Sequence, residues 1–194
     1  MPESQEKLRK SERTRRAILE AARELFAVHG YDKASVRAIA TQANIDPSMV
    51  IRYFTNKETL FAAAVDIDLR LPDLAIIPER RRGEKLAEHF MSLWEGEHRN
   101  EVLPILLRSA VTEELAAERL RNVYTTQVQR RIARITGRED AKRRAGLVSS
   151  QLMGIALSRY FLRLPGVADR PPAEIVADIS PTLQRYLMGR LPSK

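Results

Sequence analysis

The chain has 194 residues, of which 44% are hydrophobic, and a formal net charge of +8, so it can form a compact core and suits a polyanionic partner. It has no cysteine, which excludes disulfides and thiolate metal sites. No apolar segment has the length of a signal-peptide core or a membrane span, so we expect a soluble, cytoplasmic protein.

The N-terminal part of the chain is rich in basic residues. We expect residues 1–10 to form a flexible basic tail and a first helix to run from about Glu12 to His29, with Gly30 ending it. The segment from Lys7 to Arg16 contains six basic residues and one acidic residue. This segment could follow a DNA backbone, as basic N-terminal arms do, or it could be the solvated start of a helix. The sequence leaves both readings open.

The stretch from Ser35 to Phe61 predicts two short helices joined by a tight turn and followed by a third helix. Asn44 tolerates the left-handed conformation that a chain needs to leave a helix. Asp46 then caps the next helix, and Pro47 occupies its first position, where the missing N–H costs nothing. Before the turn, apolar or small residues follow the Ser35 cap at helical spacing, at Val36, Ile39, Ala40 and Ala43. This pattern indicates a helix-turn-helix, the motif that places its second helix in the DNA major groove.

The second helix of this motif carries the residues expected to read bases. A helix-turn-helix reads base edges with the N-terminal part of that helix, which here presents Pro47, Ser48, Met49 and Arg52. Val50 should instead face the core. Arg52 is the residue of this set that can make a bidentate contact with a guanine edge. A phosphate contact or a solvated charge is the alternative for Arg52.

Three blocks of sequence resemble the N-terminal domain of the tetracycline-repressor (TetR) family of transcription regulators. They are R-R-A-I-L-E-A-A-R-E-L-F-A-V-H-G-Y from Arg15 to Tyr31, S-V-R-A-I-A from Ser35 to Ala40, and R-Y-F-T-N-K-E-T-L-F from Arg52 to Phe61. Two positions depart from the family pattern. Asn44 stands where the family usually has glycine, and Ile51 stands where it usually has a tyrosine that contacts phosphate.

Strand signals are almost absent and the helical period persists nearly everywhere, which predicts an all-α fold of about nine helices in two parts, and the family resemblance agrees with this. The resemblance places a helix-turn-helix DNA-binding domain at residues 11–56 and a helical effector-binding and dimerisation domain at residues 57–194. It also implies phosphate contacts from Ser35, Arg37, Tyr53 and Lys57, which together with Val36 and the base-reading residues form the predicted DNA-binding set. For Tyr53, burial as a core aromatic beside Phe54 is the open alternative.

The C-terminal part of the sequence predicts a helical body after a linker at residues 71–83. Regulators of this kind are homodimers in which the last two long helices of each subunit form a four-helix bundle. Those helices here carry the apolar stripes Val148, Leu152, Ile155 and Leu157, and Ile175, Ile179, Leu183 and Leu187. Burial within the monomer is the alternative for these stripes. A basic cluster in the body is read as surface or interface charge and comprises Arg130, Arg131, Arg134, Arg138, Arg143 and Arg144.

The family further implies a ligand cavity in the body. Aromatic and flexible residues that could line it are Phe90, Met91, Trp94, Tyr124, Met153 and Tyr160. Arg108, within an otherwise apolar run, is the candidate anchor for an acidic or polar ligand, although ordinary core packing or a solvent-facing position would explain any of these residues.

The sequence therefore predicts a transcriptional regulator, and specifically a repressor that binds a near-palindromic DNA operator as a homodimer and is released by a small-molecule effector. The alternative is a ligand-independent DNA-binding or architectural protein with the same N-terminal domain. No arrangement of residues typical of catalysis, of a metal site or of cofactor binding is present, so we expect neither enzyme activity nor a cofactor.

Overall fold

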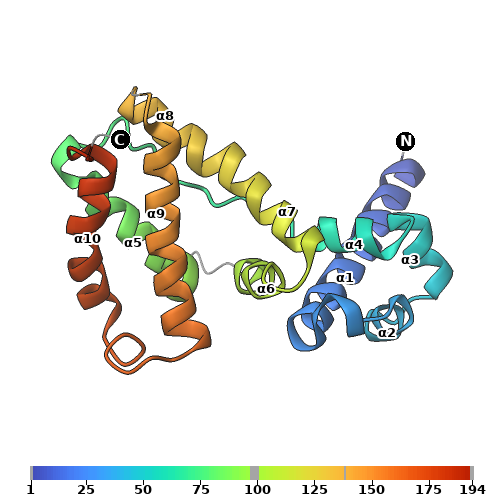
Figure 1. The fold of residues 1–194 in the computed structure, drawn as a ribbon. Coiled ribbons are helices and arrows are strands. Elements are labelled where there is room, and N and C mark those ends of the chain that lie inside the picture. Colours follow the sequence, from blue (N-terminus) through green and yellow to red (C-terminus); the bar gives the residue numbers. More distant parts are fainter. Residues whose placement is uncertain (1, 97–100, 138, 193–194) are drawn as a thin grey trace. The chain divides into compact units, whose positions relative to one another are not determined.

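The computed structural model describes residues 2–96, 101–137 and 139–192, and these residues form an all-helical protein without strands (Figure 1). The helices in chain order are α1 (Pro2–Lys33), α2 (Val36–Gln42), α3 (Pro47–Phe54), α4 (Lys57–Ala64), α5 (Arg82–Glu95), α6 (Val102–Ser109), α7 (Glu114–Val123), α8 (Arg130–Thr136), α9 (Ala141–Ala156) and α10 (Pro172–Met188). A 3₁₀ turn at Glu79–Arg81 precedes α5, and π-helical segments at Tyr124–Gln129 and Leu157–Phe161 join α7 to α8 and extend α9. Because α7 and α8 are continuous, the described residues contain nine helices, and the predicted fold class is confirmed.

The chain divides into two compact units. The first unit comprises Met1–Ile67 and Glu101–Arg121, and the second comprises Asp68–Asn100 and Asn122–Lys194. The first unit therefore contains the helix-turn-helix together with α6 and most of α7. The second unit contains α5 and the helices that follow residue 121.

Helix α1 is longer at its start than the sequence suggests. It begins at Pro2, so the described residues of the expected flexible tail are helical. Its N-terminal part contributes nothing to the core, because Ile18 is the first buried residue among the described side chains. Near its other end, Gly30 has a φ of 75°, a left-handed value that suits glycine, and this residue breaks the helical geometry as predicted.

The core of the first unit forms where α1 packs against α4. Phe61 is fully buried, and its ring lies edge-on to Phe26 and Tyr31, with centroid distances of 5.0 Å in both cases. The Arg23 side chain donates a hydrogen bond from Nε to the Ala64 carbonyl at 2.9 Å. These contacts hold α4 against α1.

The second unit is organised around α10, which packs against α5. The expected dimer stripe of α10 is buried within the single chain, at exposures of 0–5% for Ile175, Ile179, Leu183 and Leu187. Gly83 allows the close approach of the two helices, because a Cβ atom there would lie 2.5 Å from the Gln184 amide nitrogen. Burial within the monomer, the alternative reading, is therefore correct for this stripe. In α9, Val148 is buried as well, whereas Leu152 and Ile155 stay half-exposed, as does Leu157 at the start of the π-helical segment.

The segment expected to be a linker is packed into the second unit. Leu74 is 1% exposed. Arg82 donates from Nε to the carbonyl oxygens of Leu74 and Ile77, at 2.9 and 3.3 Å, and so fixes the loop before α5. Residues 71–78 contain no helix, as expected of a linker, whereas Glu79–Arg81 form the 3₁₀ turn and Arg82 begins α5. The polar and proline-rich composition did not reveal that Leu74 anchors this segment.

Candidate nucleic-acid interface

The turn between α2 and α3 is built by local hydrogen bonds. Asn44 has a φ of 53°, the left-handed value that the sequence predicted, and the Ile45 amide donates to the Ala40 carbonyl at 2.9 Å. Asp46 caps α3, accepting hydrogen bonds from the Ser48 hydroxyl and from the Ser48 amide at 2.8 Å, and both bonds lower the pKa of the Asp46 carboxyl. Pro47 is the first residue of α3, as predicted. The direction of α3 therefore depends on caps within a few residues of sequence.

One face of α3 packs inward and the other is exposed. Val50 and Phe54 are buried, at 1% and 5% exposure, so Val50 is a core residue as expected. Pro47, Ser48 and Arg52 are exposed, and Met49 is half-buried. The base-reading residues predicted from the sequence thus share the accessible part of one short helix.

The predicted phosphate-contacting residues lie at the ends of the neighbouring helices. Ser35 caps α2 and accepts a hydrogen bond from the Ala38 amide at 3.1 Å. Val36 is half-buried and Arg37 is exposed at the start of the same helix. Helix N-termini favour anions because their first N–H groups lack helical partners. However, α2 has only seven residues. Phosphate binding here would therefore depend on the Ser35 and Arg37 side chains as much as on the free N–H groups of the helix N-terminus.

Tyr53 and Lys57 make contacts within the first unit as well. Tyr53 is half-buried, and its hydroxyl donates to Ser11 Oγ at 3.1 Å. Lys57 donates from Nζ to the Asp32 carbonyl at 3.1 Å, and the same nitrogen lies 4.4 Å from the centroid of the Tyr31 ring. A phosphate would compete with these partners for the two side chains.

Ile51 is a candidate contact that the sequence reasoning considered only as a departure from the family pattern. It is 45% exposed, unusually high for a large aliphatic side chain, and lies between Val50 and Arg52 on α3. Its spacing of three residues from Ser48 was a signal that it shares the accessible face. An aliphatic side chain here suits contact with a thymine methyl group, whereas a tyrosine hydroxyl would bind phosphate.

Two family models match this chain. The model for "Bacterial regulatory proteins, tetR family" matches residues 18–64, and the model for "Tetracyclin repressor-like, C-terminal domain" matches residues 81–187. The second match spans more than half of the chain. The protein belongs to the TetR family.

Relatives with similar sequences are also regulators. Over 52 residues the chain is 40% identical to the HTH-type transcriptional regulator UidR of Escherichia coli strain K12, and over 49 residues it is 41% identical to an HTH-type transcriptional repressor of Mycobacterium tuberculosis. These matches cover 27% and 25% of this chain and 26% of each relative. They are therefore confined to about a quarter of the curated proteins.

The solved structures of a TetR-family regulator and of a repressor resemble most of the chain. A regulator from Streptomyces coelicolor A3 has a TM-score of 0.65 and 27% identity, covering 91% of this chain and 95% of its own. NalD of Pseudomonas aeruginosa, described as the secondary repressor of the MexAB-OprM multidrug efflux pump, has a TM-score of 0.66 and 25% identity, covering 92% and 98%.

Most of the residues expected to line a ligand cavity lie in the second unit of this TetR-family chain. Phe90, Met91 and Trp94 are buried in α5, and Trp94 stacks on Tyr160 with a centroid distance of 4.3 Å and an interplanar angle of 2°. The Trp94 Nε1 atom is buried and has no hydrogen-bond partner among the described residues. These aromatic side chains are therefore brought together.

The remaining cavity candidates are placed elsewhere. Met153 is half-buried in α9, and the Tyr124 hydroxyl donates to the Lys142 carbonyl at 3.2 Å. Arg108 belongs to the first unit, where it is exposed and donates from Nη1 to the Ala27 carbonyl at 3.2 Å. It thus binds a carbonyl near the end of α1, the arrangement favoured for a cation at a helix C-terminus.

An ion pair between the buried Arg159 and the partly exposed Glu95 lies beside the stacked tryptophan. Arg159 donates from Nε to Glu95 Oε1 at 2.5 Å and from Nη1 to the carbonyls of Val167 and Arg170, at 2.6 and 2.8 Å. The Tyr160 hydroxyl also donates to Glu95 Oε1, at 2.7 Å. The bond from Arg159 and, to a lesser degree, the bond from Tyr160 lower the pKa of Glu95 despite its partial burial. Glu95 is therefore fully engaged within the protein.

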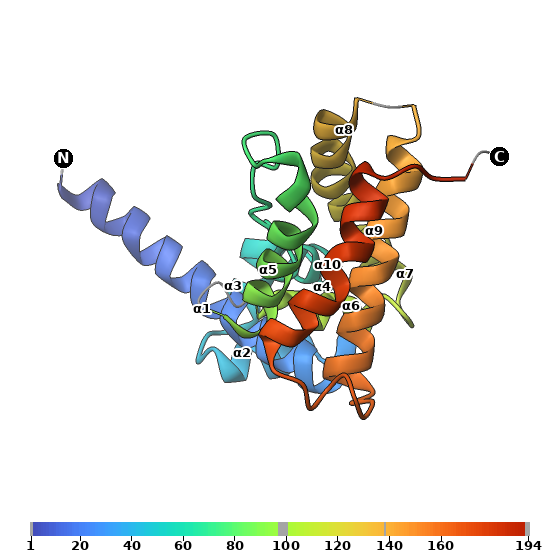
Figure 2. The ribbon, with the colours of Figure 1, turned by 90° about the vertical axis from the view of Figure 1, so that its left-hand side faces the viewer.

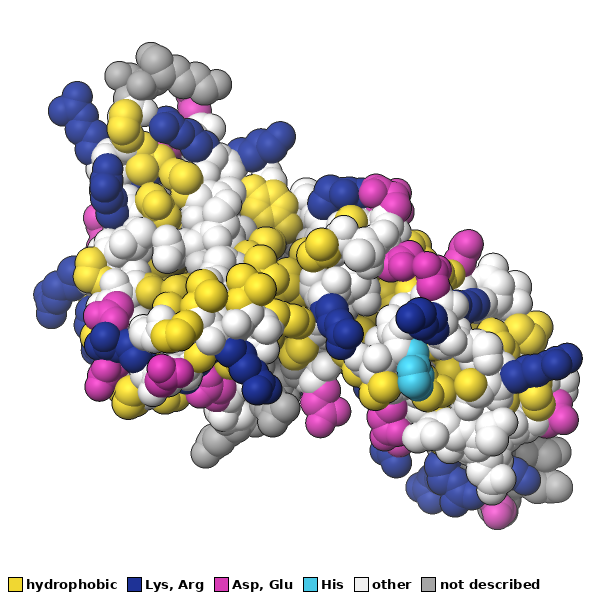
Figure 3. All heavy atoms as spheres, turned by 60° about the horizontal axis from the view of Figure 1, so that its bottom comes forward, with side chains coloured by type: hydrophobic (Ala, Val, Ile, Leu, Met, Phe, Trp, Pro, Cys, Tyr) yellow, Lys and Arg dark blue, Asp and Glu magenta, His cyan; other side chains and the backbone are white. Residues whose placement is uncertain are grey.

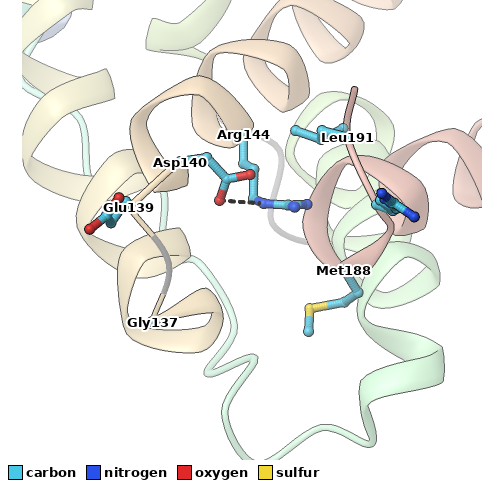
Figure 4. A pocket seen from close by; sticks show the side chains of 7 residues that line it. Gly137, Glu139, Asp140, Arg144, Met188 and Leu191 are labelled. Atoms are coloured by element: carbon cyan, nitrogen blue, oxygen red, sulfur yellow. Dashed lines mark hydrogen bonds and ion pairs between the residues drawn. The ribbon is translucent and has the colours of Figure 1, made fainter. Parts of the chain in front are cut away.

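A pocket of about 860 Å³ lies in a different part of the second unit and contains none of the predicted cavity residues (Figure 4). Arg144 points into it from α9, bonded to Asp140 at 2.9 Å and to the Tyr186 and Gly189 carbonyls, at 2.8 and 3.0 Å. The residues that line the pocket are Gly137, Glu139, Asp140, Arg144, Met188, Arg190 and Leu191.

Arg144 is 2% exposed, so its assignment to surface charge was wrong. Arg138 of the same predicted cluster lies outside the described residues.

Hydrophobic side chains gather on one face of the second unit, in the left part of Figure 3. Leu162 and Leu164, between α9 and α10, are 67% and 43% exposed.

Within the described residues, no helix is long and apolar enough to cross a membrane.

Proposed function

We propose that this protein is a DNA-binding transcriptional regulator that acts as a repressor. It binds a near-palindromic operator as a homodimer and is released by a small-molecule effector. The main support for the proposal is that α3 has a buried face and an exposed face: Val50 and Phe54 are buried, while Ser48 and Arg52 are exposed. Family membership supports the same function.

The proposal assigns DNA binding to residues 11–56 and effector binding and dimerisation to residues 57–194. Two-fold symmetry of a dimer would present two copies of α3 to the duplex, which is why the operator would be near-palindromic. Since the α10 stripe is buried within the chain, the dimer contact would use other surfaces. Two surfaces are available for it: the half-exposed Leu152 and Ile155 of α9 with the adjoining Leu157, and the exposed apolar face in Figure 3.

Changing Arg52 to alanine tests the DNA-binding proposal. Loss of a bidentate contact to guanine should weaken specific binding by roughly 1–3 kcal/mol and relax base preference at one position of each half-site. Binding is measured on duplexes selected from a random pool by the unmodified protein and on single-base variants of them. Lys57→Ala is the matched comparison, since losing a phosphate contact should lower the slope of log affinity against log salt by about 0.9 per contact.

The two variants separate base reading from phosphate binding. If Arg52→Ala weakens binding equally on all sequences, Arg52 contacts phosphate instead. If the unmodified protein selects no sequence from the pool, the DNA-binding proposal fails.

Trp94 provides a test of effector binding, because it is the single tryptophan in the chain and stacks within the predicted cavity residues. A compound that releases the duplex should change Trp94 emission and reach saturation at the concentration that releases DNA. Binding and release share one equilibrium, so Phe90→Ala should shift both curves together. Val111→Ala, at a position of the first unit that is 75% exposed, should shift neither. Release of DNA without any change in Trp94 emission would remove these aromatic residues from the effector site.

A further inference from the structure

The first four turns of α1 extend beyond the core of the first unit. Figure 2 shows this part of the helix running past α2 and α3 to the N-terminus. Among its described side chains, those between Gln5 and Arg16 are exposed except for the half-buried Thr14. A helical segment that buries no apolar stripe is only marginally stable in water, so packing within the protein stabilises this extension very little.

The extension is strongly basic. Its segment from Lys7 to Arg16 has six basic residues and one acidic residue. The described cations Arg9, Lys10 and Arg13 are all exposed. The ion pair between Arg16 and Glu20 is long, at 3.5 Å, and both side chains are more than half exposed, so it offsets little of the positive charge. Most of this charge is accessible to a partner in solution.

Two contacts fix this extension relative to the base-reading helix. The Tyr53 hydroxyl of α3 donates to Ser11 Oγ at 3.1 Å, and the guanidinium carbon of Arg15 lies 5.4 Å from the centroid of the Phe54 ring. Both partners on α3 directly follow Arg52 in the chain. The basic residues thus belong to the same compact unit as the residues that would read bases.

We propose that residues 2–16 form a second DNA-contacting element, which binds phosphates of the same duplex just outside the half-site read by α3. This inference rests on the proposed function. Residues 2–10 extend about 13 Å beyond Ser11 at about 1.5 Å per residue, a length that corresponds to about four base-pair steps along the duplex axis. Lysine and arginine bound to phosphate carry no sequence information, so the element adds affinity without changing the sequence that is recognised.

The test combines two variants with two lengths of DNA. Lys10→Gln with Arg13→Gln removes two exposed cations that belong to no other assigned contact. The control, Arg130→Gln with Arg134→Gln, makes the same change of charge at exposed positions of the second unit. Each protein is titrated with the selected duplex trimmed to its two half-sites and with the same duplex carrying one extra helical turn of DNA on each side.

On the longer duplex, the Lys10/Arg13 variant should lose salt dependence relative to the unmodified protein, by about 0.9 in slope for each phosphate contact removed. On the trimmed duplex, the two proteins should bind with similar slopes. Base preference, measured on single-base variants, should stay unchanged. Circular dichroism of each variant shows that helix content is retained.

Identical slopes for the Lys10/Arg13 variant and the control on the longer duplex would overturn the inference, while specific binding to the trimmed duplex would leave the proposed function standing. A change in base preference would also overturn it, since the extension would then read sequence. Absence of any specific binding by the unmodified protein would instead refute the proposed function.

Discussion

Replacing Phe61 by alanine is expected to lower the free energy of unfolding by about 3–5 kcal/mol, as is typical for removing a buried aromatic ring. Phe61 is fully buried, and its ring touches those of Phe26 and Tyr31 across the interface of α4 and α1. The loss of buried apolar surface and the cavity left beside the Phe26 and Tyr31 rings both contribute to this loss of stability. Urea denaturation followed by far-ultraviolet circular dichroism measures the change.

Val28→Ala is the control for this experiment. Val28 lies in α1, like Phe26, but is 66% exposed, so its truncation should change stability by less than about 0.5 kcal/mol. Similar losses for the two variants would show that the aromatic trio does not form the core of the first unit.

Replacing Arg159 by alanine should destabilise the second unit by about 1–3 kcal/mol, because the change removes a buried guanidinium that donates hydrogen bonds to a carboxylate and to backbone carbonyls. The Arg159 side chain is 8% exposed, and its loss removes the donor to the Val167 and Arg170 carbonyls and leaves the Glu95 carboxylate with only the Tyr160 hydroxyl of its described donors. Trp94 stacks on Tyr160, the neighbour of Arg159, so its emission reports unfolding of this region directly. Denaturation curves monitored by tryptophan fluorescence should shift to lower urea concentration.

Arg170→Ala makes the same change of charge at a nearby exposed site. The Arg170 side chain is 43% exposed and pairs with Glu174 at 2.8 Å and Asp178 at 3.6 Å, so its truncation should cost only about 0–1 kcal/mol. If Arg159→Ala costs no more than Arg170→Ala, the pair with Glu95 makes no net contribution to stability.

Features fixed by short-range chemistry could be predicted from the sequence. Asp46 and Pro47 begin α3, Asn56 caps α4, and Asn44 takes the left-handed conformation, as their chemistry indicates. Each of these features depends on hydrogen bonds or steric limits within about four residues. The helix-turn-helix, and with it the position of the candidate DNA-binding residues, follows from them.

Features fixed by distant partners could not be predicted. A basic run in the sequence does not distinguish Arg144, whose guanidinium is bonded to carbonyls at the end of α10, from the exposed Arg143 beside it. Similarly, the α10 stripe looked available for dimerisation because the sequence does not reveal that Gly83 brings α5 close enough to cover it. Arg108 binds the Ala27 carbonyl, a partner 81 residues away along the chain.

The separation of roles on α3 has a consequence for how such a regulator can diverge. Val50 and Phe54 hold the helix in place, while the side chains at Ser48, Ile51 and Arg52 contribute little to packing because they are exposed. Mutations at the exposed positions can therefore accumulate at little cost in folding, and each can alter which operator is bound. A duplicated copy of the gene could acquire new target promoters by a few such changes while its scaffold stayed constant.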